Sequence, residues 1–296
     1  MNLEMTWLGA AGWLLRHGDT TIAIDPFFHR PPAARPILAL RRDDLPVIDY
    51  LLATHAHYDH FADVPYLACT RARATYVPRA ALRDLERERR RLPAALRRAE
   101  TRWHGVVGGE TIALGDLHIS FHRIGTERFD LAMARDAIGK LARHGDRHDW
   151  ATAVRFLGSH FCGACHAILL HDRATDRKLI FFGMLTTDLG TLPAEHAGVD
   201  VAVLPYCPAN ADYLAESVHV ARALRPATVL VHHFDQFLPP VTVGLDMPAY
   251  ARAVEAGAPG TRVELPKFCK PFRLELTAIQ SRATSTATPA ARLARA

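Results

Sequence analysis

Short apolar runs with period-two alternation dominate the first part of the chain. Residues 3–8, 13–16 and 20–24 are runs of this kind. Glycine-containing segments at 9–12 and 17–19 separate them, which is typical of tight turns between antiparallel strands. The chain is therefore predicted to open with an antiparallel meander.

Blocks of strand pattern and blocks of helix pattern then follow one another. The other expected strands are residues 47–54, 110–114, 117–122, 151–157, 166–171, 178–182, 199–204 and 228–231. The expected helices are residues 61–70, 79–91, 211–224 and 247–256. The polar stretch 125–149 is expected to be an inserted loop with a short helix. This order predicts an α/β protein in which two sheets pack face to face with helices on the outer faces.

Length and composition limit the class of protein. The 296 residues are 49% apolar, which is enough for a substantial core and excludes a disordered or fibrous chain. We expect one domain over residues 1–276 and a disordered tail of Ala, Thr, Ser and Arg over residues 277–296. No uncharged apolar run reaches the roughly 18–20 residues that span a bilayer, and the start has no basic region typical of export signals. Five scattered cysteines argue against a disulfide framework, so we expect a cytoplasmic protein with no membrane partner.

The formal net charge of +5 is concentrated in one segment. Residues 79–98 contain eight arginines and three acidic residues, and leucines recur there near helical spacing. Because Glu and Arg interleave in this segment, it is predicted to be a solvated amphipathic helix. Docking of a phosphate-rich ligand beside it is the alternative interpretation.

The densest group of chemically active side chains follows the predicted buried strand at 47–54. His55, His57, Asp59 and His60 fall within six consecutive positions. Neutral imidazoles and a carboxylate are the ligands that Zn²⁺ and similar ions prefer, and a turn after a strand end can aim neighbouring side chains at adjacent coordination sites. The motif therefore predicts a metal centre.

This His-x-His-x-Asp-His run resembles the signature of the metallo-β-lactamase fold superfamily. Residues 7–15 and 21–28 are similar to the opening strands of its lactonase-like and phosphodiesterase-like hydrolases, and the similarity extends over residues 3 to about 275. The resemblance implies an αββα sandwich of two mixed sheets with the metal ions at one edge.

The resemblance also assigns roles to residues of the motif. His55 and His57 would hold a first ion, and Asp59 and His60 a second. Asp25 would lie beneath them as a hydrogen-bond acceptor that fixes the orientation of the ligands. Asp59 would in addition be the catalytic residue that orients the attacking hydroxide.

Two more histidines are implied from distant parts of the chain. The first would end a middle strand, where His122 is the best match and His118, inside the strand, the weaker one. The second would follow a late apolar strand, where His233 is favoured by its His-Phe-Asp-Gln-Phe context and His232 is the alternative.

One position departs from the family pattern. Relatives carry a metal-bridging aspartate in a Gly-Asp pair after a strand, but Met184 follows Gly183 here. A thioether is soft and uncharged, so it replaces a bridging carboxylate poorly. Three interpretations stay open: Asp188 supplies the carboxylate from a longer turn, only one ion is firmly held, or the bridging is weaker.

A second motif invites a different interpretation. Cys162, Cys165 and His166 form a Cys-x-x-Cys-His match to the attachment pattern of c-type haem. We favour cysteines that line the core or the approach to the site, with a zinc or redox role for the pair as the alternative. His160 or His166 could still approach the metals.

These observations together predict a metal-dependent hydrolase. One or two Zn²⁺ ions, with Mn or Fe as alternatives, would activate a hydroxide for attack on an ester, lactone or phosphodiester of a small molecule. A non-catalytic or impaired metal-binding member of the fold and a nuclease of the same superfamily are the alternative hypotheses. The chain has no separate basic and aromatic region beyond residues 79–98, so nucleic acid is not the expected partner.

Overall fold

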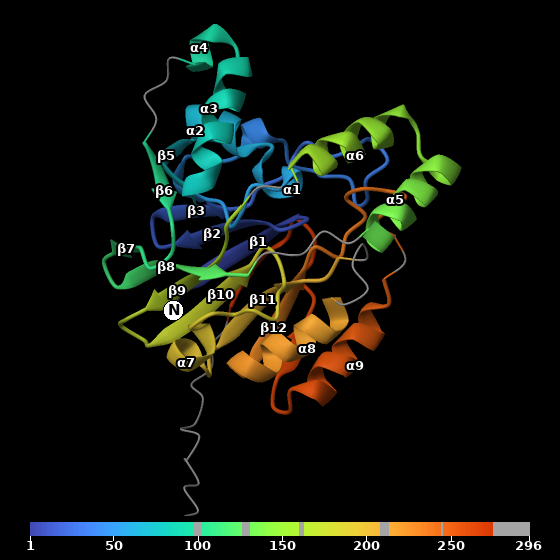
Figure 1. Ribbon diagram of the computed structural model, residues 1–296. Coiled ribbons are helices and arrows are strands. Elements are labelled where there is room, and N and C mark those ends of the chain that lie inside the picture. Colours follow the sequence, from blue (N-terminus) through green and yellow to red (C-terminus); the bar gives the residue numbers. More distant parts are fainter. Residues whose placement is uncertain (98–101, 126–130, 160–162, 208–212, 244, 275–296) are drawn as a thin grey trace, which may run out of the picture.

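Two mixed β-sheets of seven strands each form the centre of the protein (Figure 1). The computed structural model describes residues 1–97, 102–125, 131–159, 163–207, 213–243 and 245–274. The first sheet contains β1 (Leu3–Gly9), β2 (Gly12–His17), β3 (Thr20–Ile24), β4 (Ile48–Leu52), β5 (Ala72–Pro78), β6 (Trp103–Val106) and β14 (Pro271–Arg273). The second contains β7 (Thr111–Leu114), β8 (Leu117–Ile124), β9 (Cys165–Asp172), β10 (Arg177–Phe182), β11 (Val201–Pro205), β12 (Thr228–His232) and β13 (Arg262–Glu264).

The helices lie outside the sheets or at one end of them. They are α1 (Tyr58–Phe61), α2 (Val64–Thr70), α3 (Leu82–Arg91), α4 (Ala94–Arg97), α5 (Leu131–His144), α6 (Arg147–Ser159), α7 (Leu192–His196), α8 (Tyr213–Leu224) and α9 (Met247–Gly257). Two short 3-10 helices, η1 (Arg42–Asp44) and η2 (Arg79–Ala81), complete the set of described helices. None of the described helices combines the length and apolar composition that crossing a bilayer requires.

Both sheets change from antiparallel to parallel pairing along their width. The first runs β14-β1-β2-β3 antiparallel and continues β3-β4-β5-β6 parallel. The second runs β7-β8-β9-β10 antiparallel and continues β10-β11-β12-β13 parallel. The parallel strands of one sheet carry their carboxyl ends to a common edge, which is where ligands bind in open α/β sheets.

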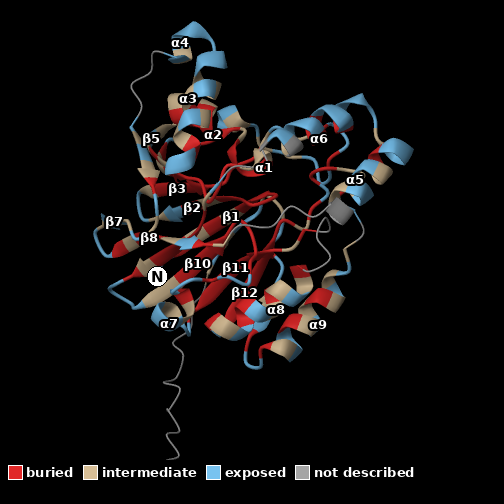
Figure 2. Ribbon diagram, viewed as in Figure 1, coloured by how far each residue is buried: buried red, intermediate tan, exposed pale blue. Residues whose placement is uncertain are grey.

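Three apolar clusters hold the layers together. The cluster between the sheets contains Trp13 and Phe121, both fully buried. A second cluster joins the outer face of the first sheet to Leu67 of α2 and Leu85 of α3. The third joins the outer face of the second sheet to α8 and α9, and Figure 2 shows the corresponding buried bands along the strands. The predicted αββα sandwich is confirmed.

One predicted strand is wrong. Residues 151–157 lie inside α6, and α5 fills much of the stretch expected to be an inserted loop. Asp146 Oδ1 accepts hydrogen bonds from the backbone N–H of His148 and Asp149, and Asp149 Oδ2 accepts one from the N–H of Asp146. These reciprocal bonds start the helix, and their effect outweighs the β-propensity of Thr152 and Val154.

Other differences are smaller. The helix expected at 61–70 is broken into α1 and α2, with Pro65 in the first turn of α2. Strands β5, β6, β13 and β14 are not among the predicted elements. The predicted disordered tail at 277–296 lies outside the described residues.

Candidate functional site

The ligand cluster lies in the loop and short helix that follow β4. Residues 54–57 leave the strand, and α1 then carries Asp59 and His60 inward, with exposed fractions of 5% and 2%. Asp25, fully buried, follows the neighbouring β3 with a φ of +45°. Its backbone N–H donates to Leu52 O at 3.0 Å, so two adjacent parallel strands deliver both groups to one edge.

Asp25 orients two of the histidines through a chain of hydrogen bonds. Its Oδ2 accepts from His60 Nδ1 at 2.8 Å and from the Thr54 hydroxyl, and its Oδ1 accepts from the Thr54 backbone N–H at 2.7 Å. Because that hydroxyl donates to Asp25, it accepts from Nδ1 of His55, 2.9 Å away. Both imidazoles therefore carry the proton on Nδ1, which leaves each Nε2 with a lone pair for a metal ion.

His233 brings a ligand from the other sheet. It follows β12 with a φ of +66°, and its backbone N–H donates to Ala10 O at 2.9 Å. Its Nε2 lies 2.9 Å from Asp59 Oδ2, and His60 Nε2 lies 3.6 Å from the same oxygen. Asp59, His60 and His233 thus present one ligand atom each within 4.8 Å of one another, as do Asp25, His55 and His60.

The His57 ring completes the cluster. Its centroid lies 4.4 Å from that of His55, and the ring of His55 lies 3.9 Å from that of His60. Five residues of the predicted ligand set, from positions 55 to 60 and 233, are therefore brought together at one edge of the sandwich.

The electrostatics of this cluster suit a cation. Burial, with the neighbouring His60 and His57, holds the pKa of His55 well below its ordinary value, so the ring is neutral. Burial by itself would raise the pKa of Asp59, but the electrostatic effect of the nearby His60 and the hydrogen bond with His233 lower it, so the carboxylate is ionised. Burial also works against a charged His233, yet its bonds to Asp59 and Cys207 raise its pKa well above the ordinary value. A proton on His233 thus holds the position that a metal ion would take, and the donor set fits such an ion.

His232 has a different role from its neighbour. Its Nδ1 accepts a hydrogen bond from the indole N–H of Trp13 at 3.1 Å, and its Nε2 donates to Phe182 O at 2.9 Å. Both nitrogens are used inside the core, and burial holds the pKa of this ring well below its ordinary value. The structure therefore places His233, and not His232, beside the ligand cluster.

Two predicted ligands are not brought to this cluster. His122 lies on the outer face of β8 beside His196 and Glu195, because its neighbour Phe121 points between the sheets. Asp188 is exposed, and its Oδ1 accepts from Gly190 N at 3.2 Å within its own turn. The structure thus places neither residue with the histidines at 55–60; His118, also on β8, is not part of any candidate metal group among the described residues.

Gly183 and Met184 pass directly beside the centre. A side chain at Gly183 would collide with Thr54 and Asp25, so only glycine allows this close approach. Met184 is 3% exposed and packs in the apolar cluster on the α8 and α9 side of the sheet. A carboxylate in the bridging position is therefore not found at Met184, and Asp188 does not take its place in this structure.

Other groups near the centre were not predicted as part of it. Cys207 follows β11 and is hydrogen bonded to His233, and its place after a buried strand was the available sequence signal. Thr54, next to the motif, was overlooked because its hydroxyl acts through Asp25. Cys165 and His166 begin β9 fully buried, and His166 N donates to Thr54 O at 2.9 Å. His160 and Cys162 lie outside the described residues.

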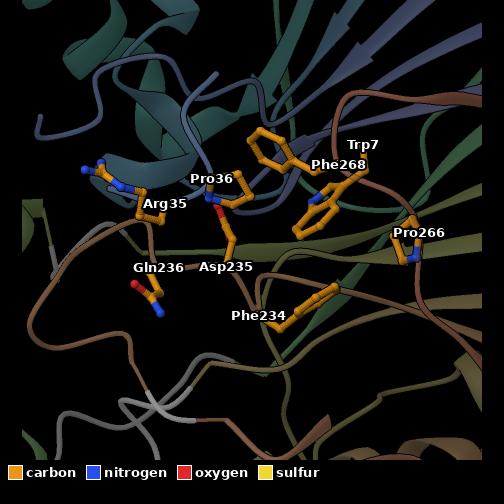
Figure 3. A pocket seen from close by; sticks show the side chains of 8 residues that line it. All are labelled: Trp7, Arg35, Pro36, Phe234, Asp235, Gln236, Pro266 and Phe268. Carbon is orange, nitrogen blue, oxygen red and sulfur yellow. The ribbon is translucent and has the colours of Figure 1, made fainter. Parts of the chain in front are cut away.

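A pocket of about 390 Å³ adjoins the segment that follows His233 (Figure 3). Trp7 stacks on Phe234 with ring centroids 4.7 Å apart and meets Phe268 edge to face at 5.5 Å. The lining residues are Trp7, Arg35, Pro36, Phe234, Asp235, Gln236, Pro266 and Phe268. Figure 3 shows three aromatic rings around the opening, which gives it mainly apolar walls.

Comparison with solved structures shows the fold. The metallo hydrolase Igni18 from Ignicoccus hospitalis superposes with a TM-score of 0.61 and 18% identity, over 92% of this chain and 99% of that one. The diiron β-hydroxylase CmlA from Streptomyces venezuelae superposes with a TM-score of 0.57 and 19% identity, over 92% of this chain and 54% of that one. Residues 20–155 match the family described as the beta-lactamase superfamily domain. This chain has the metallo-β-lactamase fold. The resemblance drawn from the histidine motif is confirmed at the level of the fold.

Sequence relatives are similar over a shorter stretch. A UPF0173 metal-dependent hydrolase of Anaeromyxobacter sp. (strain K) is 44% identical over 66 residues, which are 22% of this chain and 23% of the relative. A UPF0173 metal-dependent hydrolase of Haloquadratum walsbyi is 41% identical over 61 residues, 21% of this chain and 24% of the relative. The matched stretch thus spans less than a quarter of the length of these relatives.

Proposed function

We propose that this metallo-β-lactamase fold protein is a metal-dependent hydrolase of a small-molecule ester, lactone or phosphodiester. The observation that carries the proposal is the convergence of His55, His57, Asp59, His60 and His233, with Asp25 beneath them. The names of the sequence relatives as metal-dependent hydrolases support it. The set of nitrogen and carboxylate donors favours Zn²⁺, in one or two ions, while Mn and Fe fit the same donors less selectively.

The residues of the chain divide the work at this site. When bound, the ions supply Lewis acidity, which activates water and polarises the carbonyl or phosphoryl oxygen under attack. Asp59 remains ionised and points one oxygen at His233, so it can accept a hydrogen bond from the attacking water. Asp25 and Thr54 hold the rings of His55 and His60 in the tautomer that leaves Nε2 available.

The test is hydrolysis of a chromogenic panel by metal-stripped and metal-reloaded protein. The panel contains a p-nitrophenyl ester, a γ-lactone read by a pH indicator, and bis(p-nitrophenyl) phosphate. We expect turnover of at least one of them, its loss on chelation, and its return with Zn²⁺. His57→Ala should lack both metal and turnover, whereas His219→Ala, at an exposed position on α8, should keep both. Turnover that persists after chelation would contradict the proposal.

A non-catalytic metal-binding protein is the second candidate, and the observation in its favour is Met184. That thioether lies in apolar surroundings where the family resemblance implies an anionic bridge. The two candidates differ in one outcome: metal that depends on His57, together with no turnover across the panel, would favour the binding protein. The nuclease hypothesis gains nothing from α3, since Arg87, Arg89 and Arg91 pair with acidic residues of the same helix.

A further inference from the structure

A separate group of candidate ligands lies on the outer face of the second sheet. His122 on β8 and His196 and Glu195 on α7 each offer one ligand atom within 4.8 Å of the others. His122 Nδ1 lies 3.9 Å, and His196 Nε2 3.7 Å, from Glu195 Oε2. The two rings meet edge to face with centroids 4.8 Å apart. Figure 1 shows α7 at the lower left below the second sheet and α1 above β1, and the group shares no residue with the two candidate metal groups around α1.

One nitrogen of each of these two imidazole rings has no hydrogen-bond partner among the described residues. His122 Nε2 and His196 Nδ1 are buried, and within the described part of the chain neither has a hydrogen-bond partner. Burying a polar nitrogen without a partner costs free energy, and an ion held by His122 Nδ1 and His196 Nε2 would leave these two opposite nitrogens to a buried water. The side chain of His122 is 15% exposed and that of Glu195 is 51% exposed, which leaves the carboxylate free to move toward an ion from solvent.

The spacing is close to that of a bound metal. Ligand atoms at about 2.0–2.1 Å from a tetrahedral ion are roughly 3.3 Å apart. The two distances to Glu195 Oε2 exceed this value by about half an ångström, which a small rotation of the exposed carboxylate can remove. Two imidazoles and one carboxylate suit zinc-like divalent ions and leave a coordination position for water.

We propose that His122, Glu195 and His196 bind a divalent transition-metal ion of the Zn²⁺ class at a site separate from the centre at α1. The positive charge of Lys178 near His196 disfavours a bound cation, and the negative charge of Glu195 favours it. An ion here ties α7 to β8. It thereby fixes the end of the segment that starts at Gly183, beside Thr54 in the candidate active site.

The experiment counts bound Zn²⁺ in proteins whose main centre has been disabled. His60→Ala removes a ligand of the main centre, and equilibrium dialysis with elemental analysis then measures the remaining ions. We expect the double variant His60→Ala, His122→Ala to bind about one ion per chain fewer than His60→Ala. His118→Ala in the same background is the matched control, since it lies on the same strand four residues earlier, and it should bind as many ions as His60→Ala.

Glu195→Gln keeps the test valid if His122→Ala disturbs folding. This exposed position on α7 tolerates the change, which removes only the negative charge, and we expect Zn²⁺ to bind about tenfold or more weakly at this site. At one limiting Zn²⁺ concentration, the rise in the melting temperature of His60→Ala should become smaller when Glu195→Gln is added. Equal Zn²⁺ binding with and without His122→Ala, or an equal loss in the His118→Ala control, overturns the proposal. The test reads metal binding and melting temperature and not turnover, so it stands apart from the hydrolase hypothesis.

Discussion

The neighbouring histidines 232 and 233 give the sharpest test of the structure, because it assigns them opposite roles. Replacing His232 by Leu removes one hydrogen-bond partner from the indole N–H of Trp13 and one from the carbonyl of Phe182, and both residues are fully buried. Each lost partner costs about 1–3 kcal/mol, so we expect a loss of about 4 kcal/mol in the free energy of unfolding. A loss of this size corresponds to a fall of roughly 8–16 °C in melting temperature for a domain of this length.

His233→Asn should behave in the opposite way. Asparagine tolerates the left-handed backbone at this position, where φ is +66°, so the change mainly removes a metal ligand. We expect the variant to lose bound metal and to melt, in the metal-free state, closer to the parent protein than His232→Leu does.

The assay combines elemental analysis of purified protein with thermal unfolding in chelator. His232→Leu should retain the metal content of the parent at temperatures below its lowered transition. If instead the folded His232→Leu protein lacks metal and melts like the parent, the assignment of the two histidines is reversed and the reasoning fails.

The remaining predictions concern groups around the same centre. Thr54→Val should weaken Zn²⁺ binding about 10–100-fold by breaking the hydrogen-bond chain to His55, measured by competition with a chelating dye. Asp188→Ala should leave metal content unchanged, and a lost ion would show that this residue reaches the centre after all. Asp235→Ala leaves the buried guanidinium of Arg30 without its ion-pair partner and should lower the free energy of unfolding by about 3–5 kcal/mol, measured with denaturant. Asp84→Ala, in the exposed pair with Arg87, should lower it by about 0–1 kcal/mol. The pKa of His233 is raised in the metal-free protein, so Zn²⁺ binding must release its proton. The affinity for Zn²⁺ should therefore rise about tenfold per pH unit above about pH 7 until that pKa is passed. The same dependence of affinity on pH in His233→Asn would disprove this.

The ligand loop was predictable because its members are close in sequence. His55 to His60 follow one strand end, so their proximity needs no knowledge of the tertiary fold. The alternation of apolar residues likewise predicted the central strands, because burial on one face imposes period two. These local signals were sufficient for the fold class and for most of the site.

Assignments that depend on which face a residue occupies were harder. On β8 the apolar residues Leu117, Ile119 and Phe121 point between the sheets, so the strand alternation already indicated that His122 faces outward. The family resemblance pointed to the strand end and not to the face. In α6, β-branched residues were taken as a strand because the pattern of apolar residues does not show the capping contacts of Asp146 that start the helix.

The long separation between the ligands has a consequence during synthesis. Asp59 and His233 are 174 positions apart, and a ribosome adding about 5–20 residues per second needs roughly 10–35 s to cover that distance. During this interval the growing chain already carries the histidines at 55–60, but it lacks the partner that closes the site. On the proposed function, the nascent chain therefore carries an incomplete set of ligands during this interval, and the complete set forms only after β12 has joined the second sheet.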